Sequence, residues 1–218
     1  MDNETRWWWI RHAPVTANEG RIYGQRDLPA DFGGTDGAIG ALAAALPRDA
    51  VLITSDLRRA VDTADALRAA GATWSEAHRD PDLREQSFGD WQGLSSAEFA
   101  TMRDGLPHSG WLAPAFERAP GGESFADVVA RVVPAVIRHT AAFAGRDIVA
   151  VCHGGTIRAA LGYALGLDPE TVLAFTMETL SLTRLDHIRI GDEAGVWRIV
   201  TVNRGGHWPS ARTPDRFA

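Results

Sequence analysis

Three short apolar runs, each followed by a polar loop, restrict the fold of this 218-residue chain more than any other feature. They cover residues 7–10, 51–54 and 148–152. Runs of this length and composition are typical of strands that are buried on both faces of a parallel sheet. Because a segment with helical periodicity follows each run, the sequence predicts an α/β fold, a three-layer sandwich in which helices flank a mixed, mainly parallel sheet.

Helix signals occupy the segments around these runs. Ser55 is expected to cap the second helix and Gly71 to end it, while Pro134 is expected to kink the long third helix. Two later strands are expected to form a hairpin around Gly191 at the sheet edge. The expected helices cover residues 36–46, 55–70, 123–144 and 156–165, and the expected later strands cover 180–190 and 196–202.

The length of the chain suits a single domain, 1–218, with one small insertion. Residues 94–122 contain three prolines, Trp111 and a mixed polarity that fits neither a buried strand nor an amphipathic helix. They are expected to form an insertion or lid over a site on the main sheet. His108 in this segment is either a substrate contact or a solvated loop residue.

The charges exclude several classes of function. With 22 basic and 28 acidic residues, the net charge of −6 has the wrong sign for a protein that binds chiefly nucleic acid or an anionic membrane. All 22 basic residues are arginine, so Schiff-base chemistry and a Walker-type phosphate loop, which both need a lysine, are excluded. Arginine can still clamp phosphate, since its planar fork matches two phosphate oxygens.

Cysteine content and the first residues bear on the compartment. Cys152 is the one cysteine, which excludes an internal disulfide and a metal site built from cysteines alone. No stretch approaches the roughly 18 apolar residues that a membrane-spanning helix needs. The first six residues are acidic where a secretory signal is basic. The sequence therefore predicts a cytoplasmic protein with no membrane partner, and it leaves the oligomeric state open.

Residues with charged or reactive side chains follow the three apolar runs. Arg11 and His12 follow the first run, Arg59 lies in the helix after the second, and His153 and Gly154 follow the third. Open α/β sheets bind ligands at the carboxyl ends of their strands, so these side chains are expected to meet in one crevice. Two arginines and two histidines are a suitable lining for a phosphoryl dianion.

Each of these residues also has an ordinary structural interpretation. A single histidine such as His12 is more often structural than catalytic, and Arg11 alone is compatible with a surface charge. His153 and the two glycines after it are compatible with a tight strand-to-helix turn. The combination at three predicted strand ends favours the phosphate site.

Four ordered segments resemble the motifs of the histidine phosphatase superfamily, which includes cofactor-dependent phosphoglycerate mutases and α-ribazole phosphatases. The segments are residues 11–18 (RHAPVTAN), 55–64 (SDLRRAVDTA), 83–93 (LREQSFGDWQG) and 151–158 (VCHGGTIR). The likeness extends from Arg11 to about His207. It departs from the family pattern at Ala13, where the family usually has glycine.

The resemblance implies a role for each matched residue. His12 would be the nucleophile that forms a phosphohistidine, Glu85 the acid and base, and His153 the second catalytic histidine. The phosphate would be held by Arg11, Arg59, Asn18 and the backbone at Gly154. The phosphate arginine is expected to be Arg59 and not its neighbour Arg58. Glu123 and Ser124, at a helix start, would either cap that helix or reach the substrate, and His207 would pack near the sheet end.

These roles predict a phosphomonoesterase that acts on a small phosphorylated metabolite without a metal or other cofactor. The alternatives are phosphoryl transfer of the phosphoglycerate mutase type and a phosphate-binding module without catalysis. A mutase needs extra cations for a second phosphate, and the insertion offers only Arg103 and Arg118. Residues 88–93 also resemble the phosphatase branch, and residues 20–29 resemble α-ribazole phosphatase-like proteins, so hydrolysis is favoured.

Overall fold

A six-stranded mixed sheet organises the computed structural model, which describes residues 4–103, 111–190 and 195–205. The strand order is β3-β2-β4-β1-β5-β6. The pairs from β3 to β1 are parallel, and β5 and β6 join antiparallel at one edge, as predicted for the late hairpin. The strands are β1 (Glu4–Arg11), β2 (Ala50–Thr54), β3 (Trp74–Arg79), β4 (Asp147–Cys152), β5 (Ser181–Ile188) and β6 (Val196–Gly205).

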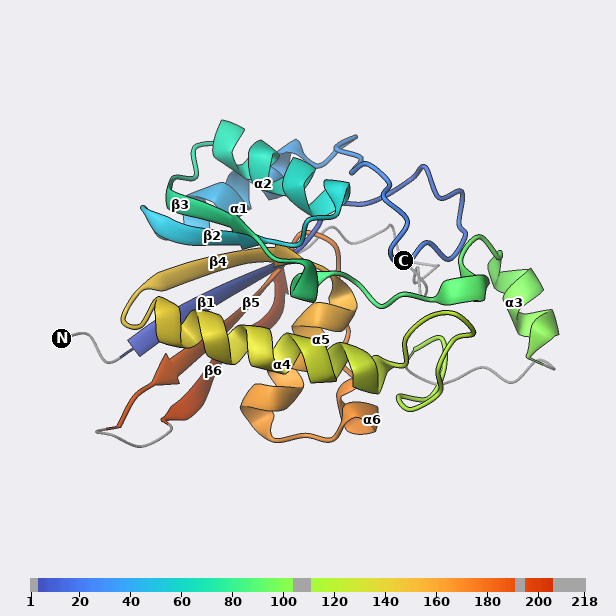
Figure 1. Ribbon diagram of the computed structural model, residues 1–218. Helices are drawn as coiled ribbons and strands as arrows, with labels where there is room; N and C mark the ends of the chain where they lie inside the picture. Colours follow the sequence, from blue (N-terminus) through green and yellow to red (C-terminus); the bar gives the residue numbers. More distant parts are fainter. Residues whose placement is uncertain (1–3, 104–110, 191–194, 206–218) are drawn as a thin grey trace.

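Helices cover both faces of the sheet and complete the predicted three layers. Figure 1 shows α1 and α2 on one face and α4, α5 and α6 on the other. The helices of these layers are α1 (Asp36–Ala45), α2 (Arg58–Ala69), α4 (Phe125–Ala142), α5 (Gly154–Leu165) and α6 (Pro169–Val172). The described helices include none that is long and apolar enough to cross a membrane.

Successive side chains of the central strands point to opposite faces of the sheet and so divide the core into two parts. In β4, Ile148 and Ala150 pack against α4 and α5, while Val149 and Val151 pack against α1 and α2. All four are fully buried, which is the reason that this run contains no polar residue. On the α4 side, the stacked rings of Trp7 and Trp9 extend the core, with centroids 4.6 Å apart.

The structure corrects several sequence-based boundaries. The helix expected from Ser55 begins at Arg58, because Ser55 accepts a hydrogen bond from Leu57 in the preceding turn and does not cap the helix. The helix expected from Thr156 begins at Gly154. Strand β3 was not predicted, since its side chains are mostly exposed and charged and carry no apolar pattern. The expected turn at Gly191 lies outside the described residues.

The insertion lies at the carboxyl end of the sheet, where Figure 1 shows α3 (Ser96–Met102) beyond the ends of the strands. It packs in a small separate core, to which the loop that precedes α1 and the 3₁₀ turn η2 (Gly89–Trp91) also contribute. The core residues are Ile22, Phe88, Trp91, Phe99, Leu112, Ala113 and Ala119. This packing places the insertion beside the loops that follow β1. His108 and His207 lie outside the described residues.

Candidate active site

Two histidines meet where neighbouring strands end. β1 and β4 are parallel neighbours with Arg11 opposite Cys152, so His12 and His153 leave the sheet side by side. The backbone N–H of His12 donates to the carbonyl of Cys152 at 2.9 Å, and the two ring centroids are 5.1 Å apart. Both side chains are buried. The structure therefore brings together two residues that are 141 positions apart.

Hydrogen bonds fix the tautomer of His12. Its Nδ1 donates to the carbonyl of Ala13 at 2.6 Å, since a carbonyl can only accept, and its Nε2 accepts from Nε of Arg59 at 3.3 Å. Burial, with the charges of Arg59 and Arg11, lowers the pKa of His12 well below its usual value. The ring is therefore neutral near pH 7, with its lone pair on the nitrogen that faces the arginine.

Ala13 fits where the family usually has glycine. The non-glycine residues with positive φ in the described chain are Glu19, Asp49, Leu180 and Asn203, so Ala13 keeps an ordinary backbone conformation. Its side chain is fully buried and its N–H donates to Thr63. The methyl group at this position therefore imposes no backbone strain.

Arg59 points into the site and Arg58 does not. The guanidinium of Arg59 is fully buried, donates to the carbonyls of Gly24 and Arg26, and lies 4.8 Å from the ring of Tyr23. Arg58, one position earlier, is largely exposed and lies 3.5 Å from a carboxylate oxygen of Asp62. The geometry thus gives the two neighbouring arginines different environments, one buried beside His12 and one exposed.

Tyr23 lies between the two arginines and was missed by sequence reasoning. Its hydroxyl is hydrogen-bonded to Arg11, and burial raises its pKa above the ordinary value. Arg11 also donates through Nη1 to the carbonyl of Met177 at 2.5 Å. No motif marks Tyr23, whose ring centroid lies 6.5 Å from that of His12.

His153 is the least satisfied polar group at the site. It is fully buried, and neither ring nitrogen has a hydrogen-bond partner among the described residues. Burial, then the charges of Arg59, His12 and Arg11, lower its pKa well below the usual value. Buried polar groups are nearly always hydrogen-bonded, so an imidazole in this state marks a place where a ligand can bind.

Glu85 closes the other side of the site, against the start of α5. Its Oε1 accepts from the N–H of Gly155 at 3.1 Å and from the N–H of Gln86 at 3.0 Å. A Cβ on Gly155 would lie 2.3 Å from this oxygen, so the carboxylate can take this place only beside a glycine. A carboxylate at the N-terminus of a helix is also favoured by the helix dipole.

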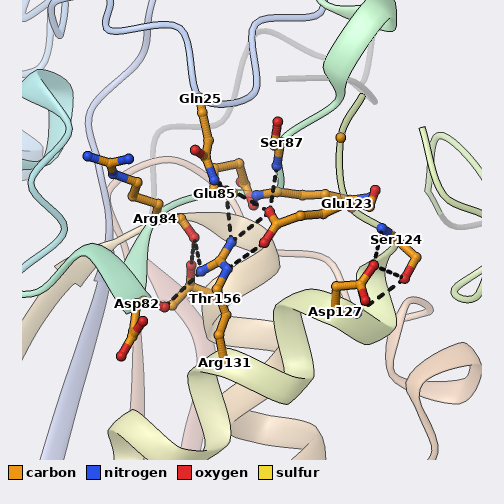
Figure 2. Close-up of polar contacts among 12 residues, drawn as sticks. Gln25, Asp82, Arg84, Glu85, Ser87, Glu123, Ser124, Asp127, Arg131 and Thr156 are labelled. Atoms are coloured by element: carbon orange, nitrogen blue, oxygen red, sulfur yellow. Dashed lines mark hydrogen bonds and ion pairs between the residues drawn. The ribbon is translucent and has the colours of Figure 1, made fainter. Parts of the chain in front are cut away.

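Arg131 of α4 fixes the backbone that carries Glu85 (Figure 2). Its Nη1 donates to the carbonyls of Asp82 and Arg84 at 2.7 and 2.8 Å, and its Nη2 donates to the carbonyl of Glu85 at 2.9 Å. Its Nε pairs with Glu123 at 2.8 Å. One guanidinium thus ties the carbonyl groups of Asp82, Arg84 and Glu85 to the helix.

Glu123 and Ser124 separate into two structural roles. Ser124 caps α4 in a capping box with Asp127, whereas Glu123 orients Arg131 and accepts from the N–H of Ser87. Figure 2 shows Glu123 between Arg131 and Ser87, and Ser124 with Asp127 apart from them at the start of α4. The expected cap is therefore made by Ser124, while the described contacts of Glu123 are with Arg131 and Ser87.

A third arginine, Arg158, lies at the start of α5 and was not singled out from the sequence. Its side chain turns back along the helix, so that Nη1 would lie 3.2 Å from a Cβ on Gly154, while Nε of Arg11 would lie 3.7 Å from the same atom. Its Nε donates to the carbonyl of Phe175 at 2.7 Å, and its guanidinium lies 4.5 Å from the ring of Trp111. Gly154 therefore leaves room for both guanidiniums.

Asn18 and Cys152 have little part in this arrangement. The side-chain amide of Asn18, expected to donate to phosphate, donates to the carbonyl of Arg21 within its own loop at 2.9 Å. Burial raises the pKa of the Cys152 thiol, which makes it a poor nucleophile. No group of three or more His, Cys, Asp or Glu side chains in the described parts of the chain is placed to hold a metal ion.

The charges at the site favour an anion. Arg11 and Arg158 lie at the start of α5, where Glu85 supplies the carboxylate, and Arg59 adds a third guanidinium at His12. Both imidazoles are neutral, because their pKa values are lowered. A doubly charged phosphoryl group would balance this excess of positive charge.

Comparison with known proteins identifies the family to which the chain belongs. Residues 7–204 match the model of the histidine phosphatase superfamily (branch 1). A solved structure described as mycobacterial hydrolase 2 is 32% identical, superposes with a TM-score of 0.79, and shares 95% of this chain and 94% of its own.

Curated relatives include phosphatases and a mutase. A bifunctional protein of Mycobacterium tuberculosis is 34% identical over 82% of this chain, which spans only 49% of that relative's length. A glucosyl-3-phosphoglycerate phosphatase of Mycolicibacterium vanbaalenii is 36% identical over 74% of each chain. A 2,3-bisphosphoglycerate-dependent phosphoglycerate mutase of Gloeobacter violaceus is 32% identical over 82% of this chain and 84% of its own.

Proposed function

The chain belongs to branch 1 of the histidine phosphatase superfamily, and we propose that it is a phosphomonoesterase that works through a phosphohistidine on His12. The observation that carries the proposal is the state of His12, a neutral buried imidazole whose unprotonated Nε2 faces Arg59. A nucleophile needs a lone pair, and the hydrogen bond from Nδ1 to Ala13 keeps that lone pair on Nε2. It accepts a hydrogen bond from Arg59 until a phosphoryl group takes up that guanidinium.

In the first step, His12 Nε2 attacks the phosphorus atom of the bound ester. The N–P bond forms as the P–O bond to the alcohol breaks, and the electron pair of the P–O bond leaves with the alcohol oxygen. Glu85 enters this step protonated and donates its proton to that oxygen, so a neutral alcohol departs and Glu85 is left as the carboxylate. Acid catalysis of this kind is typically worth about 10²- to 10⁴-fold in rate. Arg11, Arg59 and a hydrogen bond from His153 stabilise the equatorial oxygens of the transferring group.

In the second step, a water molecule attacks the phosphohistidine. The ionised carboxylate of Glu85 accepts the water proton as the new P–O bond forms. The N–P bond breaks and its electron pair returns to Nε2 of His12, which restores the neutral imidazole and releases inorganic phosphate. The same carboxyl group thus serves as acid and then as base, and no metal ion enters either step.

The insertion supports hydrolysis over the mutase alternative. Arg103 is paired with Glu117, and Arg118 is paired with Asp127 at 2.6 Å, so neither guanidinium is available for a second phosphate. A mutase must retain a bisphosphorylated intermediate, which requires such cations. A module without catalysis would have no need for a neutral His12 beside His153.

The decisive experiment is rapid mixing of the protein with a ³²P-labelled phosphate monoester. The proposal requires a burst of labelled protein that is labile to acid and stable to base, followed by release of inorganic phosphate. His12→Ala should abolish both, while His78→Ala, at an exposed histidine on β3, should retain both. Hydrolysis without a labelled protein would contradict the phosphohistidine.

Two further outcomes separate the alternatives. If 3-phosphoglycerate with its bisphosphate gives isomerised product faster than inorganic phosphate, the protein is a mutase. If no ester is hydrolysed and no label is incorporated, the site only binds phosphate. Activity should survive prolonged treatment with EDTA, and loss that zinc or magnesium restores would contradict a mechanism without metal.

A further inference from the structure

Gln25 lies between the two backbone groups that hold Arg59. The Arg59 guanidinium donates through Nη2 to the carbonyl of Gly24 at 2.6 Å and through Nη1 to the carbonyl of Arg26 at 3.0 Å. Its Nε donates to Nε2 of His12 at 3.3 Å. A shift of the backbone at Gln25 would therefore also shift Arg59, yet the mechanism of hydrolysis gives Gln25 no task.

The side chain of Gln25 reaches the backbone of the proposed acid. Its Nε2 donates to the carbonyl of Glu85 at 2.9 Å and lies 3.4 Å from Oε2 of Glu123, and Figure 2 shows the amide directed at both residues. The same Glu85 carbonyl accepts from Nη2 of Arg131 at 2.9 Å, so both of its lone pairs are used. The Glu85 backbone is thus held from α4 by Arg131 and from the loop by Gln25.

Close packing fixes the backbone of the loop at Gln25. The N–H of Gln25 donates to Oε1 of Gln92 at 2.8 Å. Gly24 has a φ of +47°, and a Cβ there would lie 2.4 Å from the same oxygen and 2.9 Å from the carbonyl oxygen of Gln86. A side chain at position 24 would therefore push the loop away. The backbone at Gln25 is thus fixed on both sides, by Gln92 and by the bonds from Arg59.

In-line displacement makes the spacing between Arg59 and Glu85 critical. The nucleophile, the phosphorus atom and the departing oxygen lie on one line in the transition state. In the proposed mechanism Arg59 holds the phosphoryl group beside His12, and the Glu85 carboxyl group must reach the departing oxygen at the far end. A misplacement of about 1 Å can cost about 10²-fold in rate. Gln25 joins the two ends, because its neighbouring carbonyls hold Arg59 and its amide holds Glu85.

We propose that Gln25 is a positioning residue that sets the spacing between Arg59 and Glu85, so that proton transfer to the alcohol stays in line with the attack of His12. This inference rests on the proposed hydrolase function and on Glu85 as the acid. Arg131 holds the same carbonyl relative to α4, whereas Gln25 holds it relative to Arg59. Gln25 therefore acts through the geometry of two other residues and needs no contact of its own with the substrate.

The first test is Gln25→Met, which keeps a side chain of similar length and removes the donor. The carbonyls of Gly24 and Arg26 remain, so KM and the Ki for inorganic phosphate should stay near the wild-type values. The kcat for glycerol 2-phosphate should fall by about tenfold or more, because its alcohol needs a proton from Glu85. The kcat for p-nitrophenyl phosphate should fall far less, because p-nitrophenol departs without one.

A second variant separates the hydrogen bond from the shape of the side chain. Gln25→Glu keeps the shape, but a carboxylate cannot donate and would face Glu123, so the loss should be at least as large as in Gln25→Met. It also serves as the test if circular dichroism shows that Gln25→Met is not folded. Arg21→Met is the matched control, because it removes a side chain of the same loop that pairs with Glu98 of α3. It should leave the ratio of the two kcat values unchanged.

Each other outcome overturns the inference. Equal losses for both esters in the folded variants would show a general structural role, and no loss would show that the hydrogen bond does not position the acid. A large rise in the Ki for phosphate would assign Gln25 to the phosphoryl end of the site. All three leave the proposed function standing, because the wild type still hydrolyses phosphate esters. If the wild type hydrolyses neither ester, the proposed function fails, and the inference fails with it.

Discussion

The carboxylate of Glu85 and the backbone of Gly155 are in direct contact. Oε1 accepts from the Gly155 N–H at 3.1 Å and lies 2.3 Å from the position that a Cβ would occupy. Gly155 is helical and has no positive φ, so its backbone conformation does not require glycine. Glycine is required at this position only because the Glu85 carboxyl group occupies the place of a Cβ.

Gly155→Ala should therefore displace the acid while leaving the helix intact. We expect kcat for an alkyl phosphate to fall by about 10²-fold or more, the usual value of a positioned acid. Steady-state kinetics would measure it. Gly40→Ala in α1 is the control, because nothing lies within 4 Å of a Cβ there. That variant should keep full activity and gain about 0.5–1 kcal/mol in free energy of unfolding. Full activity in Gly155→Ala would contradict the proposed position of the acid.

Arg131→Met should impair the acid step through the backbone of Glu85. An alkyl alcohol needs a proton to depart, but p-nitrophenol does not, so kcat should fall by about 10²-fold for an alkyl phosphate and far less for p-nitrophenyl phosphate. Arg138→Met, on the same helix and half exposed, should change neither value by a comparable factor. A similar loss for both leaving groups would indicate a general structural role and not a positioning one.

Arg59→Ala should cost far more activity than Arg58→Ala. Arg59 is fully buried and contacts His12, whereas Arg58 is 60% exposed at its side chain. Removing one buried donor to a developing charge typically costs about 10²- to 10³-fold in kcat. Loss of an exposed arginine should cost little. Comparable losses in kcat/KM would show that the site uses a different register of this helix.

The two buried histidines should make the protein less stable in acid. Their pKa values are lowered in the folded state by burial first, so between pH 6.5 and the folded pKa the unfolded chain binds more protons. Stability is then fully present above about pH 6.5 and falls as the pH decreases, with a slope of up to about 1.4 kcal/mol per pH unit for each histidine.

Urea unfolding at pH 7.5 and pH 5.5 would measure this loss. His153→Gln removes one of the two groups and should lose less free energy of unfolding between the two pH values than the wild type. His78→Gln, at an exposed site, is the matched control and should behave as the wild type does. An identical loss in His153→Gln would contradict a neutral His153 in the folded protein.

The central strands were predictable because both of their faces are buried. Ile148 and Val149 face opposite cores, so every position of that strand is apolar and the run is visible in the sequence. β3 has no such run, since its side chains from Ser75 to Arg79 are largely exposed and its place is set by pairing with β2. The helix start at Gly154 was missed because glycine is a weak helix former. The glycine at position 155 is explained by Glu85, whose carboxylate lies where a Cβ would be.

The pairing of the two histidines could also be predicted, because parallel strands bring their carboxyl ends to one edge. Tyr23, Arg131 and Arg158 could not be assigned in this way. Each reaches the site through the path of a loop or the direction of a helix, which no local pattern records. Asn18 shows the converse, since it matches a motif but makes its described side-chain contact with Arg21.

One segment of chain anchors two of the three arginines at the site. Arg11 is anchored to the carbonyl of Met177 and Arg158 to the carbonyl of Phe175, two residues away between α6 and β5. Two peptide units thus set the spacing between the guanidiniums. Any displacement of this short connection would therefore move both cations at once, so the shape of the anion site depends on a loop that carries none of the reacting groups.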